Sequence, residues 1–246
     1  MTSRSSADEN DHVYETSEKA FNEWRFDDAI AKIFEEHVRK SVPFYEEIHR
    51  MIAEISDWFL RESSLIYDLG TSTGEAILQI HGRHGGKKLR YVAVDAASPM
   101  IDRARIKLLH VPNVQFLARD LNNPFLMENA SMVLLVLTLQ FLKPESRPRL
   151  LKEVYDGLAD GGALILVEKV SGKGARFDEM WVALHHDMKR RSGFSDSEIS
   201  DKDRSLRGVM LPYSLHDDLQ LIRGAGFRKF EVFFKWYDWA GILAIK

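Results

Sequence analysis

Residues 65–74 read Leu-Ile-Tyr-Asp-Leu-Gly-Thr-Ser-Thr-Gly, and they decide the fold of this chain. The apolar run 65–69 is short and rich in strand formers, and residues 75–80 behind it follow a helical pattern. The stretch therefore predicts a strand, a tight turn and the start of a helix. Gly70 can adopt backbone angles closed to other residues and lets a ligand lie against the main chain. Three hydroxyl side chains and the free N–H groups of the helix start complete a candidate ligand cradle.

A carboxylate further along the chain supports this interpretation. By itself, such a turn is also compatible with a plain strand-to-helix connection. However, a second apolar run, residues 89–94, ends in Asp95. A carboxylate at the tip of a second strand can accept two hydrogen bonds from a ribose diol. The two features together predict a ligand that contains a nucleoside.

The glycine pattern distinguishes two kinds of nucleotide-binding turn. A dinucleotide fingerprint would read Gly-x-Gly-x-x-Gly, whereas this turn has only Gly70 and Gly74. The pattern Asp-Leu-Gly-x-x-x-Gly resembles motif I of class I S-adenosylmethionine (SAM)-dependent methyltransferases, and Asp68 and Asp95 match that family's usual positions. The resemblance implies SAM as the cofactor and an α/β, Rossmann-like fold. That fold has a mostly parallel seven-stranded sheet with a C-terminal antiparallel hairpin and N-terminal capping helices.

Composition argues against several other classes of protein. With 246 residues, of which 45% are apolar and 29% charged, the chain can bury a full core as one domain. A formal charge of −3 argues against direct nucleic-acid binding. The absence of cysteine excludes disulfides, thiolate metal sites and a cysteine nucleophile. No apolar run approaches about 18 residues, and no signal-like start occurs, so we expect a soluble, cytoplasmic protein without membrane contact.

The chain divides into three parts. Residues 1–16 are polar and nearly free of large apolar groups, which predicts a disordered tail. Residues 17–60 carry two helical patterns that we expect to cap the domain. Residues 61–246 alternate apolar strands with helices, as a parallel βαβ sheet does. The segment 171–212 departs from this alternation, and we interpret it as an insertion that shapes the substrate pocket.

The same topology places further polar side chains near the ligand. Tyr45, in the second capping helix, is expected over the amino-acid end of the cofactor. Asp120 follows the third strand, where this fold usually faces the adenine amine, although pairing with Arg119 or capping a turn is an equal alternative. Gln140 follows the fourth strand and either contacts the methionine end or substrate, or closes its loop. The expected cofactor contacts are Tyr45, Asp68, Gly70, Thr71, Ser72, Asp95, Ala96, Asp120, Leu121, Val136 and Gln140.

A closer resemblance runs from about residue 20 to residue 246. The motifs that carry it include Ser41-Val-Pro-x-Tyr45, Glu128-Asn-Ala-Ser-Met-Val133, Thr138-Leu-Gln-Phe-Leu142 and His185-His-Asp187-x-Lys189-Arg190. They are similar to those of carboxy-SAM synthase, a family that makes carboxy-SAM from SAM and prephenate. The resemblance implies a homodimer and SAM binding at the matching positions, which are Tyr45, Gly70, Thr71, Ser72, Asp95 and Asp120.

Two positions depart from that family's pattern. Its asparagine on the fourth strand corresponds to Val136, and its carboxylate-binding arginine corresponds to Asp203. Breaking a buried charge pair costs on the order of 3–5 kcal/mol. Prephenate binding would therefore need Arg204 or Arg207 to take over. The segment 201–207 is expected near the dimer interface.

Three functions remain open from the sequence. The first is an enzyme that transfers the SAM methyl group to a small molecule or converts SAM itself, for example by cyclisation with release of methylthioadenosine. Positioning alone can supply much of the barrier reduction for such a step. The second is carboxy-SAM synthesis, and the third is a non-catalytic SAM-binding module. Candidate bases or orienting groups are Tyr45, Glu168, His185, His186 and Tyr213.

The run His185-His186-Asp187 suggests a metal site at first. Adjacent histidines on a helix face different directions, however, and no third ligand follows at helical spacing. We therefore expect no metal.

Overall fold

The computed structural model describes residues 28–246, with side chains from residue 34 onwards. The expected tail, 1–16, and the beginning of the capping region lie outside the described residues. One seven-stranded sheet has the order β3-β2-β1-β4-β5-β7-β6. Its strands are β1 Leu65–Leu69, β2 Arg90–Asp95, β3 Val114–Ala118, β4 Ala130–Val136, β5 Leu158–Lys169, β6 Lys229–Trp236 and β7 Trp239–Ile245.

Strand direction confirms the predicted fold. The first five strands pair in parallel, and β7 runs antiparallel to both β5 and β6. The expected closing hairpin is therefore present. Because β1 and β4 lie at the centre of the parallel part, their carboxyl ends meet at one edge, where open α/β sheets bind ligands.

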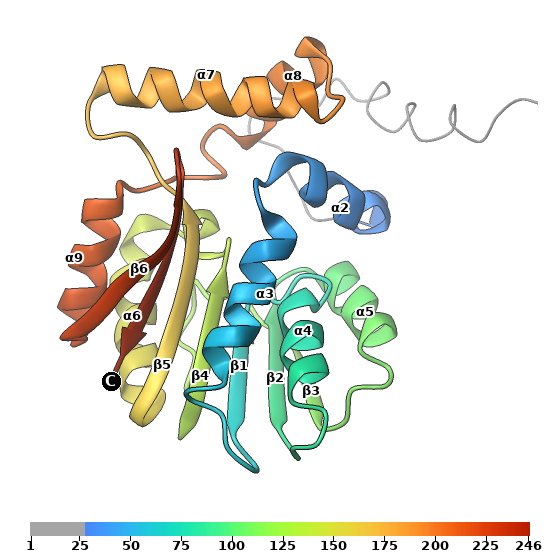
Figure 1. Cartoon of the computed structure of the whole chain (residues 1–246), viewed down its shortest axis with the longest axis vertical. Coiled ribbons are helices and arrows are strands. Elements are labelled where there is room, and N and C mark those ends of the chain that lie inside the picture. The colour runs from blue at the N-terminus through green and yellow to red at the C-terminus, as the bar shows by residue number, and fades with distance from the viewer. Residues whose placement is uncertain (1–27) are drawn as a thin grey trace, which may run out of the picture.

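Helices cover both faces of the sheet (Figure 1). On one face, α3 (Tyr45–Ser56) and α4 (Glu75–Arg83) bury isoleucines against strand residues such as Ile165. On the other, α6 (Arg147–Gly157) and α9 (Leu215–Ala225) pack on strand residues such as Leu164. Neighbouring residues of a strand point to opposite faces, so β5 is buried on both sides and reads as a continuous apolar run. The helix α5 (Ser98–Lys107) packs against β2 and β3.

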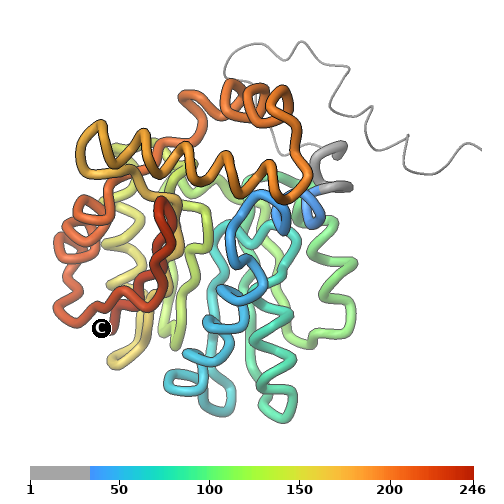
Figure 2. The backbone as a smooth tube through the Cα atoms, turned by 45° about the horizontal axis from the view of Figure 1, so that its top comes forward, coloured from blue at the N-terminus to red at the C-terminus, as the bar shows by residue number. Residues whose placement is uncertain are grey.

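Three further helices lie across the carboxyl ends of the strands (Figures 1 and 2). They are α2 (Asp28–Ser41), α7 (Ala175–Arg191) and α8 (Asp196–Leu206). The segment that we interpreted as an insertion thus contains α7 and α8. The α7 side chain His185 contacts the end of α2, since its Nε2 lies 3.0 Å from the carbonyl oxygen of Ser41. We call α2, α7 and α8 the roof.

Two short 3₁₀ turns, Leu139–Phe141 and Pro144–Ser146, connect β4 to α6. The first begins directly behind β4 and therefore lies at the ligand-binding edge. Its position is held by side chains from other elements, as described below.

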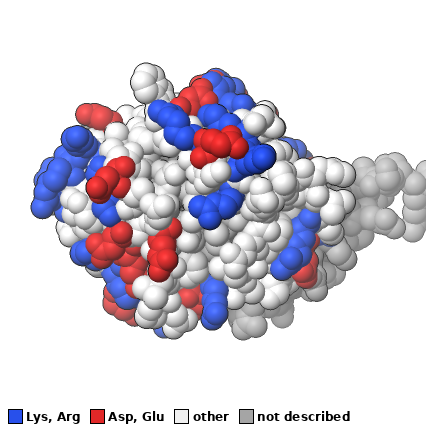
Figure 3. Space-filling model, turned by 90° about the horizontal axis from the view of Figure 1, so that it is seen from below, with Lys and Arg blue, Asp and Glu red and all other residues white. Residues whose placement is uncertain are grey.

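Surface charge is mixed on the face opposite the roof. Figure 3 shows lysines and arginines interspersed with aspartates and glutamates there, rather than gathered into one patch. None of the helices in the described part of the chain has the length and apolar character needed to span a membrane.

Substitution of a buried sheet residue should destabilise the fold far more than the same change on the surface. Ile165 is fully buried in β5, whereas Ile106 in α5 is 70% exposed. We expect Ile165→Ala to lower the free energy of unfolding by about 2–5 kcal/mol through lost burial and a residual cavity. The matched control Ile106→Ala should change it by less than about 0.5 kcal/mol. Urea denaturation measures both, and equal losses would contradict this description of the core.

Candidate active site

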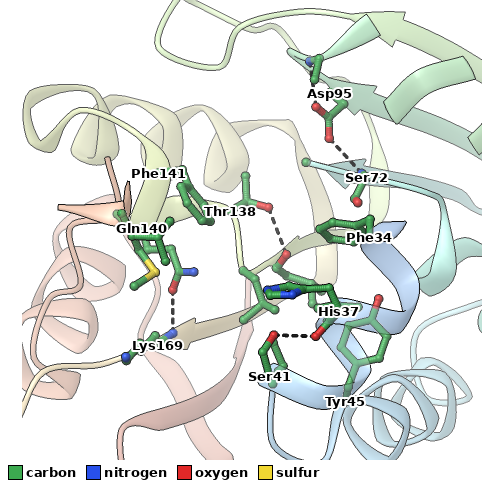
Figure 4. Close-up of a pocket in the computed structure, with 18 of the residues that line it drawn as sticks. Phe34, His37, Ser41, Tyr45, Ser72, Asp95, Thr138, Gln140, Phe141 and Lys169 are labelled. Atoms are coloured by element: carbon green, nitrogen blue, oxygen red, sulfur yellow. Dashed lines mark hydrogen bonds between the residues drawn. The ribbon is translucent and has the colours of Figure 1, made fainter. Parts of the chain in front are cut away.

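A cavity of about 490 Å³ lies between the strand ends and the roof (Figure 4). Its volume is in the range of about 300–1,000 Å³ that is usual for small-molecule sites. The cavity brings together all of the cofactor contacts expected from the sequence. The predicted residues that line it are Tyr45, Asp68, Gly70, Thr71, Ser72, Asp95, Ala96, Asp120, Leu121, Val136, Gln140, His185, His186 and Arg207.

The turn after β1 is fixed by backbone hydrogen bonds. The N–H groups of Gly70 and Thr71 both donate to the carbonyl oxygen of Val94, at 2.7 and 2.8 Å. Gly70 has a φ of +83°, and a Cβ there would lie 2.2 Å from Oγ1 of Thr138. A side chain at this position is therefore excluded both by backbone strain and by contact. The bare backbone of Gly70 borders the cavity.

Asp95 lies at the end of β2. Both of its carboxylate oxygens accept a hydrogen bond from the protein, and each can accept a further one. Its Oδ2 accepts a hydrogen bond from Ser72 N at 2.9 Å, and its Oδ1 accepts one from Ala97 N at 2.9 Å. Each carboxylate oxygen has a second acceptor site, so a diol can still bind here. Burial raises the pKa of Asp95, although these backbone N–H groups act in the opposite direction.

Asp120 lies at the far side of the cavity, after β3. Its Oδ1 accepts hydrogen bonds from the backbone N–H and the side-chain amide of Asn122, at 2.8 and 2.9 Å. The alternative that this carboxylate caps a turn is thus present in the structure. Its second oxygen leaves it able to receive an amine from the cavity as well.

Asp68 is a buried carboxyl below the turn. Its Oδ2 accepts the hydroxyl proton of Thr71 at 2.7 Å. Burial raises the pKa of Asp68 to about 7, with a further contribution from nearby Asp95 and partial relief by the Thr71 hydrogen bond. Near neutral pH, this group can therefore change charge in response to an ion that enters the cavity.

Neutral side chains line the cavity below α2. Burial and the acidic neighbours Glu75 and Glu35 raise the pKa of Tyr45 far above its usual value. Burial and nearby lysines lower the pKa of His37 to about 3. Both groups are consequently uncharged at neutral pH. Sequence reasoning missed His37, although its spacing of four from Ser41 places both on one face of α2, as Figure 4 shows.

Glu168 lies outside the cavity lining, contrary to the expectation of a base there. Its two oxygens accept the backbone N–H groups of Thr138, Leu139 and Gln140 at 2.8–3.2 Å. Burial raises the pKa of Glu168 to about 8, with Asp218 as a second cause. The carboxyl therefore anchors the 3₁₀ turn behind β4.

Two other predicted residues also lie outside the lining. Tyr213 packs its ring 4.3 Å below the guanidinium carbon of Arg147, and its carbonyl oxygen accepts the N–H of Ser171. Arg147 is buried and donates to the carbonyl oxygens of Gln140, Leu142 and Leu211. Arg204 is exposed and pairs with Asp201 within α8. Arg207, in contrast, does border the cavity.

A buried charged cluster supports the roof beside Gln140. Nζ of Lys169 lies 3.3 Å from Oδ2 of Asp238 and 3.4 Å from Nδ1 of His185. The side-chain oxygen of Gln140 accepts the backbone N–H of Lys169 at 2.8 Å. Burial lowers the pKa of His185, so its ring is neutral and joins strand β5 to α2 through Ser41. Sequence reasoning missed Lys169 and Asp238, which the hairpin brings together from distant positions.

The neighbouring histidine faces a different partner. Nε2 of His186 lies 2.7 Å from Oδ2 of Asp203 on α8, and Nζ of Lys189 lies 3.5 Å from the other oxygen of Asp203. All three side chains line the cavity. Burial lowers the pKa of Lys189, while Asp203 opposes that effect. Within residues 34–246, no group of three or more acidic or histidine side chains is arranged to hold a metal ion.

Comparison with known proteins identifies the family. A model of the methyltransferase domain matches residues 66–162. Carboxy-S-adenosyl-L-methionine synthase of Methylococcus capsulatus is 38% identical over 239 residues, which cover 96% of this chain and 99% of that protein. The Staphylococcus epidermidis protein of the same name is 36% identical, over 91% of this chain and 97% of its own length. The chain belongs to the carboxy-SAM synthase family.

Solved structures agree on the fold. Human N-acetylserotonin methyltransferase in complex with SAM superposes with a TM-score of 0.61 and 16% identity, over 89% of this chain and 55% of that chain. A SAM-dependent methyltransferase from Aquifex aeolicus gives a TM-score of 0.59 and 18% identity, over 90% and 99%. At such identities the likeness concerns the fold alone. Together with family membership, it makes this protein a SAM-dependent transferase of the class I methyltransferase superfamily.

The cavity residues of this protein fit SAM chemically. The carboxylate of Asp95 retains acceptor sites that suit a ribose diol, and the side-chain-free Gly70 leaves room against the backbone. Asp68 lines the cavity, and with a pKa raised to about 7 its carboxyl can become negative when a positively charged ligand enters.

SAM affinity should depend on pH through Asp68. Its raised pKa of about 7 means that it is protonated in the free protein at lower pH, whereas the SAM sulfonium favours the ionised form. Affinity should thus rise about tenfold from pH 6 to pH 8, because binding below the pKa releases a proton. Calorimetry with SAM measures this rise. S-adenosylhomocysteine, which lacks the sulfonium charge, and Asp68→Asn should both give a flatter profile, and an unchanged profile in Asp68→Asn would contradict the assignment.

Glu168→Gln should act on stability more than on chemistry. The amide removes one acceptor oxygen facing the backbone N–H groups of the turn, so we expect a loss of about 1–3 kcal/mol in the free energy of unfolding. Exposed Glu145→Gln is the matched control. Thermal denaturation measures both. Unchanged stability with lost turnover would instead make Glu168 the base.

Proposed function

We propose that this protein is a SAM-dependent methyltransferase that acts on a small molecule. The main observation in favour of this proposal is a contrast between the two sides of the cavity. The residues expected to contact SAM all line the cavity, whereas Asp203 lies on the roof side at the position where the family's carboxylate-binding arginine is expected. Val136 replaces the family asparagine on the cavity floor. Both replacements disfavour a dicarboxylate as the second substrate.

Methyl transfer requires little beyond positioning and the exclusion of water. SAM, when bound, supplies a methyl group on a positively charged sulfur. Asp95 and the Gly70 turn hold the nucleoside part, and Gln140, fixed through its bond to Lys169 N, orients the amino-acid part. The roof helices exclude water, and the neutral side chains Tyr45 and His37 border the reacting region without offering a competing charge.

Carboxy-SAM synthesis is the second candidate. Identity of 38% across almost the entire length of the Methylococcus capsulatus relative favours it. Lys189 and Arg207 border the cavity and could receive a carboxylate if Asp203 turned aside. In that case, the charge reversal at Asp203 would be compensated locally.

Mass spectrometry of the products separates these reactions. The protein is incubated with SAM alone, then with prephenate, then with a panel of small hydroxyl, amine and thiol compounds. We expect S-adenosylhomocysteine and a product heavier by one methyl group with an acceptor, and loss of both in Asp95→Ala. Carboxy-SAM formed from prephenate would establish the second candidate instead. Methylthioadenosine from SAM alone would indicate cyclisation, and bound SAM with no conversion under any condition would favour a binding module.

We propose in addition that the protein is a homodimer with residues 201–207 near the interface. Arg204 on α8 pairs with Asp201 of the same helix, and the two side chains are 61% and 55% exposed. Sedimentation at micromolar concentration should give the mass of two chains. A single-chain mass throughout the concentration range would contradict the proposal.

A further inference from the structure

His186 and Asp203 form a hydrogen-bonded pair at the roof of the cavity. They come from two different helices, α7 and α8, and the distance from Nε2 to Oδ2 is 2.7 Å. The side chains are 25% and 36% exposed, so both are reachable from the cavity that they line. A structural ion pair on the outer surface would not meet this condition.

The hydrogen bond determines which ring nitrogen carries the proton. A carboxylate only accepts, so Nε2 of the neutral ring is the N–H and Nδ1 holds the lone pair. No residue among 34–246 forms a hydrogen bond with Nδ1 of His186. The ring therefore has one nitrogen fixed by the protein and one able to accept a proton. Asp203 would stabilise the positive ring that results, in the way that a carboxylate orients a catalytic histidine.

The cavity lining around the pair is charged in part and apolar in part. Asp203 is paired with His186 and Lys189, and Lys202 and Arg207 line the same cavity. Val182, one helical turn before His186, lines the cavity on the same side of α7. Further apolar lining comes from Phe34, Phe141, Leu206 and Met210. This lining fits an uncharged, mostly apolar molecule with a protic group.

We infer that His186, oriented by Asp203, is the general base that accepts the proton of a neutral hydroxyl group on the second substrate. This inference rests on the proposed methyl transfer. The hydroxyl oxygen forms a bond to the methyl carbon of SAM, and the carbon–sulfur bond breaks with its electron pair moving to sulfur. The hydroxyl proton passes to Nδ1 of His186, while Nε2–H stays hydrogen-bonded to Asp203. The products are a methyl ether, S-adenosylhomocysteine and a protonated imidazole.

Histidine nitrogen NMR tests the contact without turnover. The protein, labelled with ¹⁵N and saturated with S-adenosylhomocysteine, is titrated with phenol and, separately, with benzoate and benzylamine. Phenol should shift the Nδ1 signal of His186, which is assigned by its absence in His186→Gln, and the other two probes should not. In Asp203→Asn, the fixed Nε2–H tautomer should be lost. No phenol-induced shift, or an equal shift with benzoate, would overturn the inference.

Turnover provides the second test, with phenol as the acceptor and S-adenosylhomocysteine as the measured product. His186→Gln should lower kcat by about 100-fold or more, as loss of a general base does, with unchanged SAM affinity. Asp203→Asn should lower kcat by a smaller factor. The matched controls His110→Gln and Asp187→Asn, both exposed away from the lining, should retain wild-type rates. Methyl transfer that persists in His186→Gln would overturn the assignment of His186 as the base but leave the proposed function standing. If the wild-type protein does not methylate phenol, the inference that the second substrate reacts through a simple hydroxyl group is overturned.

Discussion

A single carbonyl oxygen organises the floor of the active site. Val94, the residue before Asp95, receives the N–H groups of both Gly70 and Thr71. These bonds draw the turn after β1 across the end of β2. Ser72 N then reaches the Asp95 carboxylate, and the side-chain-free face of Gly70 borders the cavity. The cofactor side of the cavity is thus built mainly from backbone geometry, which depends on the parallel pairing of β1 and β2.

Buried carboxyl groups hold the loops at the strand ends in place through hydrogen bonds. Glu168 receives three successive backbone N–H groups of the turn after β4, and Asp68 receives the hydroxyl of Thr71. Burying an acid costs free energy unless the carboxyl is hydrogen-bonded. Here, part of that cost is offset by hydrogen bonds from the loop that each carboxyl fixes. The raised pKa values of both groups have the same origin, since burial outweighs those hydrogen bonds. Loop shape and proton affinity are therefore coupled at this site.

The sheet and the cavity lining at its strand ends could be predicted from the sequence because both follow from local patterns. The strand at 65–69, Gly70 and Asp95 can each be recognised from a few neighbouring residues. The alternation of strands with helices then determines where the carboxyl ends of the strands meet. The roof could not be predicted in this way. Whether His186 meets Asp203, or Lys169 meets Asp238, depends on how helices and the hairpin pack across long sequence separations. The orientation of Glu168 could not be predicted for a related reason: its place at a strand end indicates the ligand edge, but not that its carboxyl turns towards the adjacent 3₁₀ turn.

The division between a backbone-built floor and a side-chain-built roof has an evolutionary consequence. Changes in α2, α7 or α8 can replace the groups that meet the second substrate while the hydrogen bonds to Val94 and Asp95 remain as they are. A lineage could thus pass from one reaction of SAM to another through few substitutions, without an intermediate that fails to fold or to hold its donor. Divergence of chemistry in such a scaffold would be recorded in the roof helices, and overall sequence identity would be a poor guide to it.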